Sequence, residues 1–255
     1  MEERKVAIVT GSATGVGAAT ALKLAQRGWN VLINCSKSEA EAREAQAACE
    51  AAGADTLLLR GDVSKDADCK AMVAATVKRW KRIDALVNNA GTSVFGADAA
   101  WDKIDEEVFH RIMGVNTFSV FQMLRACLPH LKAAQGSVVN VSSVAGALGI
   151  GSSVPYVASK GAVNSLTLHF ARQLAPEVRV NAVCPALITS RWFDQGLGPG
   201  GLDKAIAATE AHTPLGRPST PEDVAEAIVW LICGAPTVTG ELLMIDGGTH
   251  LGTRR

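Results

Sequence analysis

The chain of 255 residues has few aromatic side chains, 5% in all, and its only tyrosine is Tyr156. It also lacks a charge excess, because 25 Lys and Arg residues balance 25 Asp and Glu residues. Nucleic-acid-binding proteins usually carry a basic excess or stripe, so this balance argues against a nucleic-acid partner. No apolar run approaches the ~18 residues of a membrane-spanning helix, which argues against a membrane partner.

Paired cysteines are also missing. The six cysteines are scattered, with no Cys-x-x-Cys pair and no clustered histidine, which argues against a disulfide framework or a metal site. We expect Cys69 and Cys127 to be small packing residues rather than nucleophiles. The charged residues 1–5 run directly into a predicted strand and leave no room for a signal peptide, so a cytoplasmic location is expected.

Short β-rich segments alternate with longer helical segments along the whole chain. Strands are predicted at 6–10, 30–35, 54–60, 83–88, 137–142, 178–184 and 241–246, and helices at 15–27, 39–52, 65–81, 102–133, 156–174 and 221–233. The helix at 102–133 is expected to be interrupted near Gly114. This alternation predicts an α/β Rossmann fold: a doubly wound, seven-stranded parallel sheet with helices on both faces. No linker divides the sequence, so a single domain over 1–255 is expected.

The segment 185–220 is predicted to be irregular. An unstructured stretch of this length in a compact domain is typical of a functional lid or a mobile loop. Within it, residues 190–213 combine Trp192, Phe193 and Leu197 with four glycines, which are apolar anchors on a flexible backbone. We therefore expect residues 190–213 to form a lid that closes over substrate.

A glycine-rich turn, Thr-Gly-Ser-Ala-Thr-Gly-Val-Gly, joins the first predicted strand to the first helix at residues 10–17. A dinucleotide pyrophosphate needs close backbone approach and free N–H groups at a helix N-terminus, which glycines permit. An ordinary tight turn is the alternative, but the position after the first strand of a βαβ series favours a cofactor site. The residues predicted to bind cofactor here are Gly11, Ser12, Thr14, Gly15, Val16 and Gly17.

The end of the second strand predicts the form of the cofactor. A site for NAD places Asp or Glu about twenty residues beyond the glycines, where the carboxylate binds the ribose hydroxyls and repels a 2′-phosphate. Here the neutral Cys35 occupies that position, and Ser36 and Lys37 follow as a phosphate-binding pair. NADP(H) is therefore expected to be preferred. If Lys37 is merely a solvated loop cation, NAD(H) would serve as well.

Tyr156 and Lys160 are four residues apart at the start of a predicted helix, so both project from one face. A cation about 4 Å from a phenol can lower its pKa by nearly three units, from about 10 toward the working range. This predicts Tyr156 as a general acid/base, the alternative being an ordinary amphipathic helix with a solvated lysine. Ser143 lies thirteen residues earlier, just past the fifth strand, where open α/β sheets bind ligands.

Several further motifs follow in order along the chain. After the Gly-x-x-x-Gly-x-Gly spacing of residues 11–17 come Asp62-Val63, Asn88-Asn89-Ala90-Gly91, Pro185 and Asp246-Gly247-Gly248. In this order they resemble the short-chain dehydrogenase/reductase family over essentially the entire chain. The resemblance implies hydride transfer between a nicotinamide dinucleotide and a carbonyl or alcohol.

The same resemblance implies roles for individual residues. It selects Ser143 rather than Ser142 as catalytic and adds Asn116, for which a plain helix-surface asparagine is the alternative. Ser143 and Tyr156 would grip the substrate oxygen, Lys160 would lower the tyrosine pKa and hold the nicotinamide ribose, and Asn116 would anchor a water. The implied cofactor contacts are Asp62, Val63, Asn89, Ala90, Gly91, Tyr156, Lys160, Pro185, Ile188 and Thr189.

Two features bear on the substrate. The stretch 213–217, Thr-Pro-Leu-Gly-Arg, is similar to bacterial 3-oxoacyl-acyl-carrier-protein reductases, but residues 132–135 lack the basic character with which that subgroup docks acidic carrier protein. A sugar, polyol, steroid or other small-ketone reductase fits equally well. Ala186 stands where a glycine usually follows the proline. The resemblance also implies a homotetramer.

A non-catalytic dinucleotide sensor on the same fold is the rival interpretation of the function.

Overall fold

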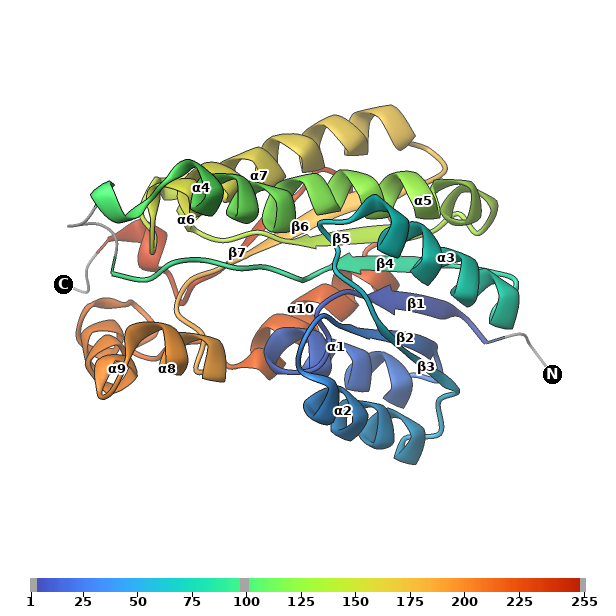
Figure 1. Cartoon of the computed structure of the whole chain (residues 1–255), viewed down its shortest axis with the longest axis horizontal. Coiled ribbons are helices and arrows are strands. Elements are labelled where there is room, and N and C mark those ends of the chain that lie inside the picture. The colour runs from blue at the N-terminus through green and yellow to red at the C-terminus, as the bar shows by residue number, and fades with distance from the viewer. Residues whose placement is uncertain (1–3, 97–100, 253–255) are drawn as a thin grey trace.

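A computed structural model of the chain describes residues 4–96 and 101–252, so the first three residues of the predicted charged N-terminus lie outside it. Its parallel sheet of seven strands has the order β3-β2-β1-β4-β5-β6-β7 (Figure 1). The strands are β1 (Val6–Val9), β2 (Asn30–Cys35), β3 (Thr56–Arg60), β4 (Ala85–Asn88), β5 (Ser137–Val141), β6 (Arg179–Pro185) and β7 (Leu242–Ile245). The predicted doubly wound sheet is confirmed, with strand ends within two residues of the predicted ones.

Helices cover both faces of this sheet. They include α1 (Gly15–Gln26), α2 (Glu39–Ala51), α3 (Asp66–Trp80), α4 (Glu106–Met113), α5 (Ser119–Ala133), α6 (Ala145–Leu148), α7 (Val154–Leu174) and α10 (Pro221–Cys233). In Figure 1, α1, α2 and α10 lie on one face, and α3, α4, α5 and α7 lie on the other. Neighbouring residues of β1 show why both faces need cover: Val9 packs into the core beneath α1 and α10, and Ile8 into the core beneath α3 and α5.

The predicted helix at 102–133 is shorter and divided. It begins at Glu106, because Asp105 caps it by accepting a hydrogen bond from Val108 N at 2.8 Å. A π-helical turn, η3 (Gly114–Phe118), then separates α4 from α5, which confirms the interruption near Gly114. The residues before the cap form only a short 3₁₀ turn, η2 (Trp101–Lys103).

The prediction of an irregular segment at 185–220 is wrong. It contains α8 (Arg191–Leu197) and α9 (Gly201–His212), separated by Gly198 and Gly200 at positive φ values of 74° and 67°. Neither helix contains a fully buried residue, so neither gives the apolar periodicity by which helices are recognised in a sequence. Among the described residues, no helix is long and apolar enough to span a bilayer.

Candidate active site

A pocket of about 1010 Å³ opens at the carboxyl ends of the central strands. It lies where the sheet order reverses between β1 and β4, the position at which doubly wound folds bind ligands. Its wall combines the turn after β1, the ends of β2 and β3, the loops after β4, β5 and β6, and the start of α7.

The glycine-rich turn is built for close backbone approach. Gly11 has a φ of 61°, and a Cβ there would lie 2.9 Å from Ala90 Cα, while a Cβ on Gly17 would collide with Gly11 O and the side chain of Asn89. Gly11, Thr14, Gly15 and Val16 line the pocket. The other two predicted residues lie behind the pocket wall. Gly17 packs against Gly11 O and Asn89. Ser12 Oγ donates to Val9 O at 2.7 Å and accepts from Asn34 N at 2.9 Å.

The loop after β4 is locked to this turn. Asn89 Nδ2 donates to Thr10 O and to Gly11 O, each at 2.9 Å, and Thr10 Oγ1 accepts from Asn89 N at 3.0 Å and from Ala90 N at 3.1 Å. Asn89, Ala90 and Gly91, for which the resemblance implies cofactor contacts, all line the pocket. The turn and the loop therefore form one rigid surface.

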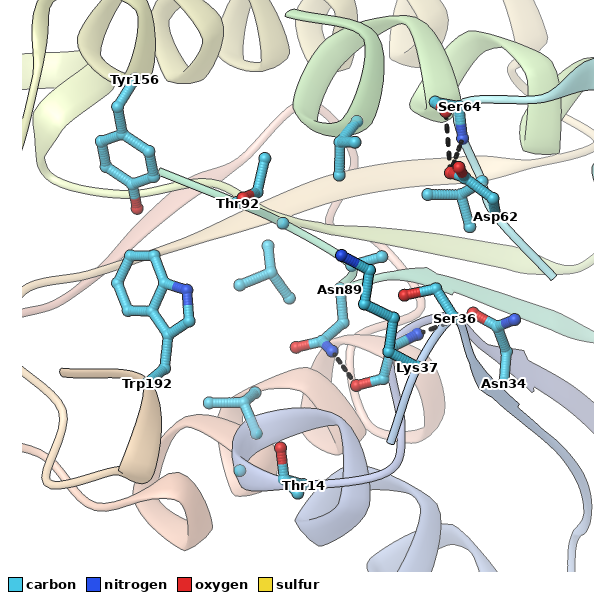
Figure 2. Close-up of a pocket in the computed structure, with 18 of the residues that line it drawn as sticks. Thr14, Asn34, Ser36, Lys37, Asp62, Ser64, Asn89, Thr92, Tyr156 and Trp192 are labelled. Atoms are coloured by element: carbon cyan, nitrogen blue, oxygen red, sulfur yellow. Dashed lines mark hydrogen bonds between the residues drawn. The ribbon is translucent and has the colours of Figure 1, made fainter. Parts of the chain in front are cut away.

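The end of β2 supplies polar and cationic groups. Ser36 and Lys37 line the pocket and point into it (Figure 2). Cys35, predicted to occupy the position of an acidic cofactor ligand, is 3% exposed and packs in the core on the α2 side, because side chains alternate along a strand. Arg60, at the end of β3, also lines the pocket, and sequence reasoning missed it. The available signal was a basic residue immediately before Gly61-Asp62.

The loop after β3 closes the far end of the same pocket. Asp62 and Val63, for which cofactor contacts are predicted, line it. Asp62 Oδ1 accepts hydrogen bonds from Ser64 N at 3.0 Å and from Ser64 Oγ at 2.7 Å (Figure 2). Asp62 N in turn donates to Asp68 Oδ2 at 2.8 Å. These bonds fix the loop before α3 begins.

Tyr156 and Lys160 project from the first turns of α7 into the pocket. Burial raises the pKa of Tyr156 to about 12, against the opposing effect of a hydrogen bond with Ser143. Burial also lowers the pKa of Lys160 to about 8. Lys160 Nζ donates to Val141 O at 2.7 Å and lies 5.6 Å from the centroid of the Tyr156 ring.

The expected lowering of the tyrosine pKa by Lys160 is therefore absent from this structure. Two buried groups each favour their neutral form, and the ammonium group is directed at a carbonyl of β5 rather than at the phenol. The phenol is accordingly held as a proton donor. The arrangement can deliver a proton to an oxygen atom placed between Tyr156 and Ser143.

The two serines after β5 have different partners. Ser142 Oγ donates to Asn164 Oδ1 at 2.6 Å, which ties this loop to α7. Ser143 Oγ accepts from Ala145 N at 3.1 Å and donates to Pro185 O at 3.3 Å, a long bond that a better acceptor could replace. Ser143 is thus the serine whose hydroxyl is available beside Tyr156.

Asn116 is buried rather than on the helix surface, with 2% of its area exposed. It lies in η3, where Nδ2 donates to Thr92 O at 2.9 Å and to Ser159 Oγ at 3.0 Å, and Oδ1 accepts from Thr92 N at 2.7 Å. Its side chain does not line the pocket, and protein groups satisfy it without a water. Asn116 therefore joins the loop after β4 to the α7 residue adjacent to Lys160.

The end of β6 contributes Pro185 to the pocket, and the loop that follows contributes Ala186 and Ile188. Thr189, also predicted to contact cofactor, does not line it. The Thr189 hydroxyl donates to Ser219 O at 3.4 Å, and its backbone N donates to the same oxygen at 3.0 Å. Because successive side chains of an extended segment point to opposite sides, Ile188 faces the pocket and Thr189 faces away from it.

An aromatic cluster closes the catalytic end. Trp192, on α8, lies 6.0 Å from Tyr156 between ring centroids (Figure 2). Phe95 meets the Trp192 ring edge-on at 4.8 Å and the Phe193 ring at 5.9 Å. Arg191, beside the cluster, forms a 2.6 Å ion pair with Glu41 of α2. The segment predicted as a lid thus reaches both Tyr156 and the opposite side of the pocket.

Comparison with known proteins gives consistent matches. A family model described as enoyl-(acyl carrier protein) reductase matches residues 11–250. A Streptomyces violaceoruber protein described as a ketoacyl reductase of the granaticin polyketide synthase is 40% identical over 98% of this chain and 97% of its own length. The L-fucose dehydrogenase of Bos taurus is 35% identical over 98% and 91%, respectively. A solved Burkholderia xenovorans structure described as a short-chain dehydrogenase/reductase is 42% identical, with a TM-score of 0.90 over 99% of this chain and 100% of that chain.

The chain belongs to the short-chain dehydrogenase/reductase family. It is accordingly an NAD(P)-dependent oxidoreductase that acts on alcohol or carbonyl groups of small molecules. The pocket fits a dinucleotide because its glycine turn leaves no room for a Cβ at Gly11 or Gly17 and presents the N-terminus of α1 to the cavity.

Proposed function

We propose that this enzyme reduces a small carbonyl compound, or oxidises the matching alcohol, with NADP(H) as the preferred cofactor and Tyr156 as general acid/base. The observation that carries this proposal is the convergence of Tyr156, Ser143 and Lys160 at one end of the pocket whose other end is the glycine-rich turn. When bound, the nicotinamide donates or accepts the hydride.

Tyr156 supplies the proton in the direction of reduction. Since burial raises its pKa to about 12, the phenol is protonated at neutral pH and can transfer its proton to the substrate oxygen. Ser143 donates its hydroxyl hydrogen to the same oxygen and orients the carbonyl. Lys160, with a pKa of about 8, is mostly charged at neutral pH, so it can hold a ribose hydroxyl and stabilise a developing phenolate.

Asn116 is assigned a supporting role in proton movement. Its side chain fixes Thr92 and Ser159, and the π-helical turn that carries it leaves main-chain carbonyls out of the regular helical pattern. We assign to this turn the anchoring of the water through which Tyr156 regains its proton.

NADP(H) is the preferred cofactor in this proposal because no acidic side chain follows β2 at the pocket wall. Ser36 offers a hydroxyl and Lys37 a positive charge at the place where the adenosine ribose would lie. Proteins that select NAD have a carboxylate here, which would repel a 2′-phosphate. NAD(H) would then bind more weakly rather than not at all.

We propose a small carbonyl or alcohol as the substrate, with a carrier-bound thioester as the alternative. Two of the relatives are described as a ketoacyl reductase and an L-fucose dehydrogenase, so both small oxoacyl esters and sugars belong in a first substrate panel. Lys132, in the stretch where carrier protein would dock, is paired with Glu177 at 3.6 Å. Monitoring NADPH absorbance or fluorescence with this panel, in both directions, tests the function. Cofactor binding without turnover of any substrate would instead favour a dinucleotide sensor.

We also propose a lid at 190–213 and a homotetramer. Phe118, Phe121 and Leu168, on the outer sides of η3, α5 and α7, are 56%, 36% and 50% exposed, more apolar surface than packing on the sheet requires. A closed two-fold assembly would cover it. Light scattering at micromolar concentration should give about four times the chain mass of 26.6 kDa, and a monomer would refute the assembly.

A further inference from the structure

The end of the pocket beyond β2 carries a second cation besides Lys37. Parallel pairing of β2 with β3 places Arg60 directly opposite Cys35. Ser36 and Lys37 are the next two residues of the chain after Cys35. Arg60 therefore belongs to the same stretch of pocket wall, although it is more than twenty residues away in the sequence.

Arg60 is oriented by the backbone. Its Nε donates to Ser36 O at 3.2 Å, which holds the guanidinium beside the Ser36-Lys37 loop. In the part of the chain that the structure describes, its two terminal nitrogens have no hydrogen-bond acceptor and form no ion pair. Two donors of a planar fork are thus free on a side chain that has already lost part of its rotational freedom.

The nearest carboxylates of α2 are already neutralised by other arginines. Glu39 pairs with Arg43 at 2.6 Å, and Glu41 pairs with Arg191 at 2.6 Å. The acids that follow β3 are engaged as well, Asp62 with Ser64 and Asp68 with the amide of Asp62. These neutral donors leave Asp62 and Asp68 charged, but Lys65 lines the same part of the pocket. Lys37, Arg60 and Lys65 therefore outnumber the two carboxylates, and the net positive charge at this end of the pocket favours an anionic ligand.

We propose that Arg60 is the main residue by which this enzyme selects NADP(H), its guanidinium binding the adenosine 2′-phosphate through paired N–H···O bonds and Lys37 adding a weaker, more mobile contact. A guanidinium matches two phosphate oxygens at once, whereas an ammonium group acts as a point charge on a flexible stem. This assignment rests on the proposed function, because it requires that the pocket hold a nicotinamide dinucleotide.

Equilibrium binding tests the assignment without any knowledge of the substrate. Trp192 lines the pocket, so quenching of tryptophan fluorescence and energy transfer to the reduced nicotinamide report NADPH and NADH binding. We would compare wild type, Arg60→Gln, Lys37→Gln and a control, Arg27→Gln, which removes an equal charge from the α1–α10 contact away from the pocket. Adenosine 2′,5′-bisphosphate and adenosine 5′-phosphate would serve as competitors that differ only in the 2′-phosphate.

Arg60→Gln should weaken NADPH binding about 30-fold, the loss typical of a charge-assisted hydrogen-bonded pair, and change NADH binding less than about threefold. Lys37→Gln should weaken NADPH only about threefold to fivefold, as expected for a mobile, solvated cation, and Arg27→Gln should change neither. The 2′,5′-bisphosphate should lose its advantage over the 5′-phosphate in Arg60→Gln alone. Unchanged melting temperatures would show that the variants are folded.

An unchanged ratio of NADPH to NADH affinity in Arg60→Gln would overturn the assignment, as would an equal loss of both. A larger loss in Lys37→Gln than in Arg60→Gln would transfer the main role to Lys37. If wild type bound neither dinucleotide, the proposed function itself would fail. If wild type bound NADPH and NADH equally well and Arg60→Gln changed neither affinity, the assignment of Arg60 would fail while the proposed function would stand.

Discussion

The two ends of the pocket are held in different ways. At the cofactor end, main-chain and side-chain hydrogen bonds join the turn after β1 to the loop after β4, and glycines sit where no larger residue fits. At the end that holds Tyr156, α8 and α9 have no buried residues. Trp192 and Phe193 contact Phe95, Phe193 also packs against the edge of the core, and the half-exposed ion pair Arg191–Glu41 joins α8 to α2. The two ends therefore differ in how firmly they are fixed, and the proposed lid assigns movement to the second end.

The largest effect should follow from damage to the preformed end. Gly17→Ala would place a methyl group against Gly11 O and the side chain of Asn89, so either the turn or the β4 loop must shift. We expect cofactor affinity to fall at least about a hundredfold, since the backbone could no longer approach the pyrophosphate. Titration of NADPH against tryptophan fluorescence checks this. Gly28→Ala is a control for loss of a glycine, because its Cβ would meet nothing. Its positive φ of 80° predicts reduced stability but unchanged cofactor affinity.

The titration of Lys160 should appear in the pH profile. Because burial lowers its pKa to about 8, Lys160 is protonated below that pH and neutral above it, while Tyr156 stays protonated to about 12. The kcat/KM for NADPH should therefore fall about tenfold per pH unit above about pH 8, since kcat/KM reports groups of the free enzyme. Lys160→Arg, charged throughout, should lose activity overall but show no alkaline limb near pH 8. A limb that persisted in this variant would assign it to another group.

Breaking the Arg191–Glu41 ion pair should have a moderate effect confined to the mobile end. Glu41→Gln removes the 2.6 Å contact that joins α8 to α2, and such half-exposed pairs are weak. We expect the KM for substrate to rise about twofold to fivefold and amide exchange of α8 to accelerate, with α1 unaffected. Glu44→Gln, an exposed change on the same helix, is the matched control. Equal acceleration in both variants would show that the ion pair does not hold the lid.

The smallest expected effect is the change in amide exchange when ligands are added to the unmodified protein. If residues 190–213 act as a lid, adding NADPH together with a substrate should slow amide exchange in α8 and α9 more than in the turn after β1. Because the turn is already fixed by hydrogen bonds, its protection should change little. Exchange in α8 and α9 that is the same with and without both ligands would count against a lid.

The sequence predicted the strands and the turn of the cofactor end better than it predicted α8 and α9, for physical reasons. Strands such as β1 and β2 are buried along their full length, so their apolar runs are unambiguous. The helices α8 and α9 have no buried positions and are flanked by glycines, so nothing distinguished them from an irregular loop. Local pattern identifies an element only where burial imposes a period.

The residues around the site show a second limit. Tyr156 and Lys160 could be predicted from their spacing, and Ser143 from its place after a strand together with the family resemblance. The sequence did not indicate that burial would set the pKa values of Tyr156 and Lys160. Arg60 was missed because its proximity to Ser36 depends on strand pairing. Conversely, Thr189 and Cys35 lie in the right segments but on the wrong side of an alternating backbone.

The central claim, that Tyr156 transfers the proton at a site separable from the preformed cofactor site, is tested most directly by Tyr156→Phe. The variant keeps the ring that faces Trp192 and loses only the hydroxyl. We predict that kcat falls at least about a hundredfold, while the dissociation constant of NADPH, measured on the same preparation, stays within about threefold. Turnover within a few-fold of wild type would contradict the account.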